Sequence, residues 1–256
     1  MKHKQFVLAT DLDGTFLGGS DNDRNALYRF IEDRRDDVGL IFVTGRDTRF
    51  IEQLCADSTV PYSIPWPDYV VGDVGTTIAE IVGATRKVRP LAALEADIAE
   101  LWNDNGDRIR ALLDKAAGLT LQDTPFRYRV SYHFDPEAYD GAAERIVRHH
   151  GFDALISADR FFDVLPPGVS KGPSLRRLLK HLGVADERVL VAGDTLNDLS
   201  LFETGLRGVA VANSEAALIA NLRDRRNAYR AATAGAGGIA EAIRHFNFFS
   251  KAGETV

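Results

Sequence analysis

Two aspartates that follow a short apolar run, Asp11 and Asp13, are the first residues of this chain whose types and spacing could do chemistry. The run, residues 6–9, has the character of a buried strand, and Gly14 ends it. Side chains two residues apart in a strand point to the same side, so the two carboxylates are expected to be neighbours. Paired buried carboxylates repel each other, which predicts a compensating divalent cation. The alternative interpretation is that Asp13 caps a following helix.

Three more polar residues stand at comparable places along the chain. Thr44 follows the apolar strand of residues 38–43, and Asp194 follows the one at residues 189–193. Lys171 begins a helix that precedes the second of these strands. In a doubly wound sheet the carboxyl ends of the strands share one edge, where ligands bind. We therefore expect these three residues to meet the aspartate pair in one site.

The helices and strands that must position these residues follow one another in two different patterns. Apolar strands alternate with helices in the first and last parts of the chain, which is typical of parallel crossover units. Between these parts, the order helix-strand-strand-helix-strand-strand favours an antiparallel sheet with helices on one face. The sequence therefore predicts an α/β fold: a doubly wound, Rossmann-like parallel-sheet core with an inserted α+β cap domain. The predicted division is residues 1–84 (core, first part), 85–165 (cap) and 166–256 (core, second part).

Composition excludes several classes of protein. A net charge of −6 argues against a nucleic-acid surface, which needs a basic footprint. The apolar run near the N-terminus is too short for a signal-peptide core or a membrane span. The single cysteine, Cys55, is expected in a helix as a structural thiol, and its isolation favours a reducing compartment. We expect a cytoplasmic monomer or small homo-oligomer that binds a small molecule, and neither nucleic acid nor a membrane.

The polar segments, taken in order, resemble the haloacid dehalogenase superfamily of phosphohydrolases. Its pattern is Asp-x-Asp-x-Thr, a strand-end Thr or Ser, a Lys, and a Gly-Asp-x-x-Asn-Asp motif that occurs here at residues 193–198. The insert lies between the second and third motifs, the position of the larger cap type. Segments 68–78, 129–132 and 162–166 are similar to the sucrose-phosphate phosphatase branch, which neighbours mannosylfructose-phosphate phosphatase. The resemblance extends over essentially the whole chain.

This resemblance implies a role for each motif residue. Asp11 is the expected nucleophile, and Asp13 is the expected acid/base, which protonates the departing sugar oxygen and then deprotonates water. The expected cofactor is Mg²⁺, since hard oxygen ligands without His or Cys favour it over zinc. The implied metal-site residues are Asp11, Asp13 through its carbonyl, Asp194 and, in support, Asp198. The implied phosphate-binding residues are Thr44, Gly45, Lys171 and Asn197.

The implied reaction is hydrolysis of a sugar phosphate through an aspartyl phosphate, and the branch favours a non-reducing disaccharide phosphate of the sucrose-phosphate or mannosylfructose-phosphate type. Thr195-Leu196 stands where sucrose-phosphate phosphatases often have Ser-Gly, so sucrose phosphate itself is not implied. Alternatives are a mannosylphosphoglycerate or sugar-monophosphate phosphatase, or a phosphomutase. A phospho-accepting receiver-like signalling module is an alternative of another class; it lacks the insert and a residue in the role of Asp13.

The cap supplies candidates for sugar binding. Residues 126–134 alternate in character, and one set is predicted to pack on the cap helices: Phe126, Tyr128, Val130, Tyr132 and Phe134. The opposite set is expected to form a polar ceiling over the site: Arg127, Arg129, Ser131 and His133. The alternative interpretation is that this second set is simply solvated on an exposed sheet face.

Overall fold

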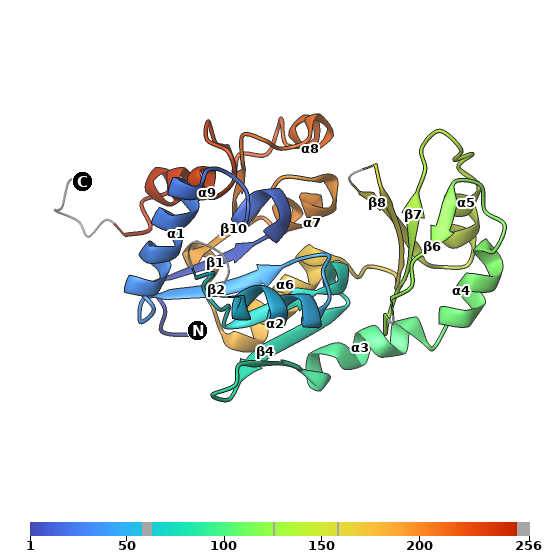
Figure 1. The fold of residues 1–256 in the computed structure, drawn as a ribbon, viewed down its shortest axis with the longest axis horizontal. Coiled ribbons are helices and arrows are strands. Elements are labelled where there is room, and N and C mark those ends of the chain that lie inside the picture. Colours follow the sequence, from blue (N-terminus) through green and yellow to red (C-terminus); the bar gives the residue numbers. More distant parts are fainter. Residues whose placement is uncertain (58–62, 125, 158, 250–256) are drawn as a thin grey trace.

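The computed structural model describes residues 1–57, 63–124, 126–157 and 159–249, and Figure 1 shows two sheets with their helices. The larger sheet contains β1 (Phe6–Thr10), β2 (Val38–Val43), β3 (Tyr69–Gly72), β4 (Thr77–Val82), β5 (Lys87–Pro90), β10 (Val189–Gly193), β11 (Arg207–Ala210) and β12 (Ala228–Arg230). The smaller sheet contains β6 (Leu119–Leu121), β7 (Val130–Phe134), β8 (Asp153–Ser157) and β9 (Phe161–Leu165).

The α-helices have the following bounds: α1 (Asp21–Asp33), α2 (Thr48–Ala56), α3 (Ala92–Trp102), α4 (Gly106–Leu113), α5 (Ala142–His149), α6 (Lys171–Leu182), α7 (Leu199–Glu203), α8 (Ala216–Asn221) and α9 (Gly235–His245). Four short helical turns complete the elements: η1 (Leu12–Phe16), η2 (Asp73–Gly75), η3 (Asp186–Arg188) and η4 (Leu196–Asp198). Within the described ranges, every helix is too short or too polar to cross a membrane.

The larger sheet is mostly parallel, which confirms the predicted fold class. Its strand order is β12-β11-β10-β1-β2-β3-β4-β5, and only β4 and β5 run antiparallel to their neighbours. The first strand, β1, lies in the middle: Thr10 is in register with Ala192 of β10 on one side and with Phe42 of β2 on the other. The loops that follow these three strands therefore lie side by side at one edge.

The central strands β1, β2 and β10 are buried at every position because both faces of the sheet are covered there. In β1, Phe6 and Leu8 face a core built with α1 and α9, whereas Val7 and Ala9 face a second core built with α6. A strand buried on both sides reads as a continuous apolar run rather than as an alternation. The sheet is thus a rigid central layer, and its polar groups gather beyond the strand ends.

The smaller sheet is antiparallel, with the order β6-β7-β9-β8. One of its faces packs against α4 and α5 through Val130, Tyr132 and Phe162, while Ser131 and Asp163 sit in register on neighbouring strands. Figure 1 shows this sheet beside the larger one, with α4 and α5 on its far side and α3 spanning the two. We call the unit from α3 to β9 the cap.

Two local expectations differ from the structure. Residues 87–90, which the sequence assigned to the insert, form β5 and pair with β4, so we propose that the cap begins at α3. The strand predicted over residues 126–134 begins only at Val130. Before that point the chain bends and is unpaired, so the alternation does not apply, and Phe126 faces a cleft instead of the cap helices.

The cap core supplies a stability prediction. Phe162→Ala removes a fully buried ring from β9 and leaves a cavity, so the free energy of unfolding should fall by about 3–5 kcal/mol. Leu121→Ala is the matched control in the same sheet, because Leu121 is 47% exposed; its cost should stay within roughly 0.5 kcal/mol. Urea unfolding measures both, and equal losses would show that the cap has no packed core of its own.

Candidate active site

Asp11 is presented by the tight turn η1 directly after β1. The turn needs Gly14, whose φ is +79°, in the left-handed region that side chains disfavour. A Cβ atom added to Gly14 would lie 2.2 Å from Oδ2 of Asp194. The glycine in the sequence motif therefore lets the β1 and β10 loops approach each other.

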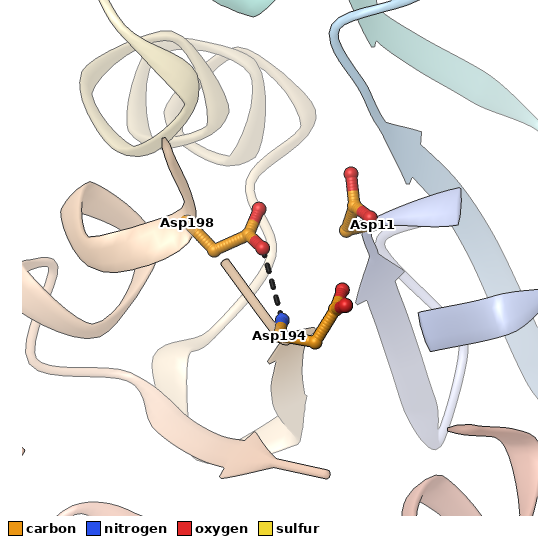
Figure 2. Close-up of side chains that lie close together, drawn as sticks. All are labelled: Asp11, Asp194 and Asp198. Carbon is orange, nitrogen blue, oxygen red and sulfur yellow. Dashed lines mark hydrogen bonds between the residues drawn. The ribbon is translucent and has the colours of Figure 1, made fainter. Parts of the chain in front are cut away.

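Three carboxylates meet at this edge. Asp11, Asp194 and Asp198 each offer an oxygen, and these oxygens all lie within 4.8 Å of one another. Figure 2 shows the three side chains converging from the ends of β1 and β10 and from the following turn η4. All three residues are buried, so their mutual repulsion is poorly screened by water.

One ammonium group compensates part of this charge. Nζ of Lys171, at the first position of α6, donates to Asp11 Oδ1 at 2.7 Å, to Asp198 Oδ1 at 2.6 Å and to Asn197 Oδ1 at 2.9 Å. Burial lowers the pKa of Lys171, but Asp11 and Asp198 outweigh it and raise that pKa above its usual value. The lysine is 0% exposed and stays charged because it has these partners.

Burial raises the pKa of two of these carboxylates, Asp194 and Asp11. Burial raises the pKa of Asp194 to about 7, although Thr15 donates a hydrogen bond to its Oδ1 at 2.6 Å. Burial also raises the pKa of Asp11 well above its usual range, against the opposing effect of Lys171. Three buried carboxylates with hard oxygen donors and a single ammonium group fit a divalent cation, which would favour their ionised forms. The cluster is thus able to bind a metal ion.

Asp198 has a different position from the other two acids. Its Oδ2 accepts the backbone N–H groups of Asp194 and Thr195, both at 3.0 Å, while Oδ1 accepts Lys171. Thr195 and Asp198 form a capping box at the start of η4. The Thr195 hydroxyl also donates to Asn197 Oδ1 at 2.8 Å. Because both carboxylate oxygens are engaged, Asp198 braces the loop and the lysine.

Asp13 lies outside the carboxylate cluster. It forms a two-point ion pair with Arg46, from Nε to Oδ2 at 2.8 Å and from Nη2 to Oδ1 at 3.1 Å. Both side chains are about half exposed and line the cleft described below. Arg46 follows Thr44-Gly45 and reaches back to the Asp13 carboxyl, whose role as acid/base stays a prediction. Ligation of a metal by the Asp13 carbonyl stays a prediction.

The loop after β2 provides the next two predicted residues. Thr44 is buried, and its Oγ1 accepts the backbone N–H of Arg46 at 3.1 Å, which shapes the loop. Gly45 lines the cleft, and its carbonyl accepts Nη2 of Arg129 at 3.0 Å. The structure thus gathers Asp11, Lys171, Asp194, Asp198 and Asn197 at one edge of the sheet, with the Thr44 loop on the adjoining strand end.

A cleft of about 600 Å³ lies between this edge and the cap. Its core side includes Asp11, Asp13, Gly45, Arg46 and Asn197. Its cap side is lined by Gln122, Thr124, Phe126, Arg129, Ser157, Arg160, Phe161 and Asp163. A mixed polar and aromatic lining suits a hydroxyl-rich ligand.

Only one of the four cap residues proposed from sequence, Arg129, lines this cleft. Arg127 instead pairs with Glu95 through two hydrogen bonds of 2.9 Å. Ser131 donates to Asp163 within the cap, and His133 is exposed beside Phe161. Sequence reasoning missed the β8–β9 corner with Arg160 and Phe161, because no motif marks a turn that reaches a cleft through its tertiary position.

Comparisons with known proteins agree on one family. The family model described as sucrose-6F-phosphate phosphohydrolase matches residues 4–247. The X-ray structure of sucrose-phosphatase from Synechocystis, in complex with sucrose and phosphate, superimposes with a TM-score of 0.84 at 29% identity. That match covers 96% of this chain and 100% of the other.

Two curated relatives add detail. Mannosylfructose-phosphate phosphatase of Agrobacterium fabrum is 29% identical over 250 residues, covering 94% of this chain and 96% of that protein. Glucosylglycerol-phosphate synthase of Pseudomonas anguilliseptica is 40% identical over 248 residues, covering 96% of this chain. The chain spans only 31% of the length of that synthase.

The raised pKa of Asp194 predicts how stability depends on pH in protein stripped of metal with EDTA. An unfolded aspartate loses its proton near pH 3.8, whereas folded Asp194 keeps it until about pH 7. Between these values the folded state binds the extra proton, so the free energy of unfolding should fall as pH rises, by on the order of 4 kcal/mol. Urea unfolding in steps from pH 4 to pH 8 measures the slope.

Asp194→Asn should make that slope shallower. The decline in the free energy of unfolding that remains would come from Asp11, whose pKa burial also raises. Asp107→Asn, at a side chain 97% exposed, is the control that should leave the slope unchanged. An identical pH slope in Asp194→Asn and the wild type would contradict the assignment.

Proposed function

The chain belongs to the sucrose-6F-phosphate phosphohydrolase family of phosphatases, and from this premise we propose that it hydrolyses the phosphate ester of a glycoside with Asp11 as nucleophile. The observation that carries the proposal is the contact between buried Lys171 and Asp11 at the floor of the cleft. A lysine in that position favours the ionised, nucleophilic form of the carboxylate, against the effect of burial, and places a cation beside the incoming phosphoryl group.

The proposed reaction has two steps. An oxygen of Asp11 attacks phosphorus in line, the bond from phosphorus to the sugar oxygen breaks, and the leaving oxygen takes a proton from Asp13. A water molecule then attacks the aspartyl phosphate, Asp13 accepts its proton, and inorganic phosphate leaves with Asp11 restored. Arg46 pairs with the ionised form of Asp13 in this structure. Asp13 must therefore exchange that pairing for a proton before it can act as the acid.

The phosphoryl oxygens need donors that are already in place. We assign this role to the Thr44 hydroxyl, the Gly45 amide, the Lys171 ammonium and the Asn197 side chain. Lys171 fixes the carbonyl oxygen of Asn197, which turns the amide nitrogen toward other partners. Preorganised donors of this kind stabilise the charge on a transferring phosphoryl group without reorganising during the reaction.

Mg²⁺ is the cofactor that we propose for the carboxylate cluster. Asp11 and Asp194 would hold it, with the Asp13 carbonyl as a further oxygen ligand and Asp198 bracing the loop. When bound, Mg²⁺ supplies charge neutralisation between the Asp11 carboxylate and the phosphate. Its charge would offset the repulsion that burial leaves among the acids.

The proposed substrate is a phosphorylated glycoside, with a non-reducing disaccharide phosphate as the first candidate. The family description, the Synechocystis structure and the Agrobacterium relative all name phosphates or products of this type. Glucosylglycerol phosphate is the second candidate, because the relative with 40% identity is named for it. The cap side of the cleft is where the two candidates would be distinguished.

The first test is phosphate release from a panel containing sucrose phosphate, mannosylfructose phosphate, glucosylglycerol phosphate and simple sugar phosphates. With Mg²⁺, the wild type should turn over many times on at least one glycoside phosphate, and EDTA should stop it. Asp11→Asn should lose at least about 10⁴-fold in kcat, because the nucleophile is gone.

Asp107→Asn is the matched control, at an exposed position of cap helix α4, and should retain full activity. Substantial turnover by Asp11→Asn would remove Asp11 from the nucleophile role. A stable phosphoprotein without turnover would indicate a receiver-like module instead.

The second test concerns the cap. Phe161→Ala removes an aromatic wall of the cleft, so kcat/KM on the preferred glycoside phosphate should fall by about 10-fold. Activity on a small aryl phosphate, which does not fill the cap side, should change less than twofold. Equal losses on both substrates would show that Phe161 supports the catalytic edge and does not read the sugar.

A further inference from the structure

The turn η2 (Asp73–Gly75) has an unusual backbone. Asp73 and Val74 have φ values of +51° and +58°, and Gly75 has +100°. Left-handed conformations are costly for a β-branched residue such as Val74, and consecutive ones persist only where neighbouring structure holds them.

The turn lies between the two segments that carry the proposed phosphate-binding groups. On one side, the Asp73 and Val74 N–H groups donate to the carbonyls of Arg46 and Thr44, at 3.0 and 3.1 Å. On the other side, the Gly75 carbonyl accepts Ser174 Oγ at 2.6 Å. The turn therefore links the Thr44 loop to the first turn of α6.

At Gly75, the backbone of η2 lies directly against the backbone at the start of α6. A Cβ atom at Gly75 would lie 2.8 Å from the backbone nitrogen of Lys171 and 2.3 Å from the carbonyl carbon of Ser170. Only a glycine leaves room for the two backbones to meet. The position of Lys171 thus depends directly on the position of η2.

Arg129, a side chain of the cap, reaches this region. Arg129 is 5% exposed, and its Nη2 donates to the Gly45 carbonyl at 3.0 Å and pairs with Asp73 Oδ1 at 3.5 Å. Its Nη1 pairs with Asp163 Oδ1 on β9 at 3.1 Å, and its guanidinium lies 3.7 Å from the ring centroid of Phe126. One buried guanidinium therefore joins cap strand β9 to both the Thr44 loop and η2.

We propose that Arg129 is a positioning residue that couples the cap to the phosphate-binding edge through Asp73 and Gly45. It holds the Thr44 loop and η2, and through η2 it fixes the start of α6 where Lys171 projects. This inference rests on the proposed phosphatase function for its kinetic consequence, but the structural linkage stands on the contacts alone.

The chemistry of the pairing requires an arginine. Asp163 is buried and Asp73 is largely buried, with its side chain 13% exposed; the two carboxylates come from different parts of the fold, and removing their shared cation leaves both poorly compensated. A guanidinium presents donors on separate nitrogens and serves acceptors in several directions, whereas a lysine offers one nitrogen. Arg129→Lys should therefore keep the positive charge but fail to reach Gly45, Asp73 and Asp163 at the same time.

The first experiment measures the linkage without activity. Hydrogen–deuterium exchange should be compared in wild type, Arg129→Lys, Arg129→Met and the control Arg89→Met. Arg89 makes an exposed ion pair with Glu80 on the β4–β5 hairpin, so the control removes a guanidinium that does not touch η2. In both Arg129 variants the Asp73 and Val74 amides should exchange at least about tenfold faster, because their hydrogen bonds open more often. Arg89→Met should match the wild type.

The second experiment separates positioning from sugar recognition. With Arg129→Lys, kcat/KM should fall about 10- to 100-fold on both the glycoside phosphate and a small aryl phosphate, since a misplaced loop impairs both. Inorganic phosphate should inhibit about tenfold more weakly. Asp73→Asn should give losses in the same direction, and the Arg129→Lys/Asp73→Asn double variant should lose less than the product of the two single effects.

Two results would overturn the proposal. Unchanged exchange at Asp73 and Val74 would break the linkage, and a loss confined to the glycoside phosphate would make Arg129 a sugar ligand. If Arg129→Met does not fold, Arg129→Lys and Asp73→Asn carry both measurements. If the wild type hydrolyses none of the panel, the proposed function fails, and the exchange comparison still decides the linkage.

Discussion

The site depends on one electrostatic constraint: three carboxylates are buried around a single ammonium group. Lys171 contacts Asp11 and Asp198 but not Asp194, and burial raises the pKa of both Asp11 and Asp194. Such a cluster is unfavourable unless further positive charge arrives. A site built to receive a divalent cation and a phosphoryl group has this character before its ligands bind.

The fold holds these charges close together by using rigid neighbours. Asp11 and Asp194 follow adjacent strands, Gly14 lets their loops meet, and Asp198 is fixed by backbone N–H groups at the start of η4. None of these side chains relies on a flexible surface loop for its place. The cost of crowding the acids is therefore offset by a sheet whose two faces are fully packed.

The sequence predicted best those site residues that lie at the carboxyl edge of the parallel sheet. The meeting of Asp11, Lys171 and Asp194 at one edge was predictable, because parallel strands end together and the glycine after the aspartates marks a turn. The sequence did not predict the Arg46–Asp13 pair or the left-handed turn at Asp73 and Val74. Both arise from contacts between distant segments, which no local pattern records. The alternation over residues 126–134 failed before Val130 because an alternating pattern predicts faces only for a chain that is paired in a sheet.

In the proposed reaction, Asp11 carries the phosphoryl group between the two steps. Rapid acid quench during turnover of a glycoside phosphate with Mg²⁺, followed by mass spectrometry of peptides, tests it most directly. We expect a base-labile phosphate on the peptide containing Asp11 in the wild type and none in Asp11→Asn. Phosphate on any other residue, or full turnover by Asp11→Asn, would contradict it.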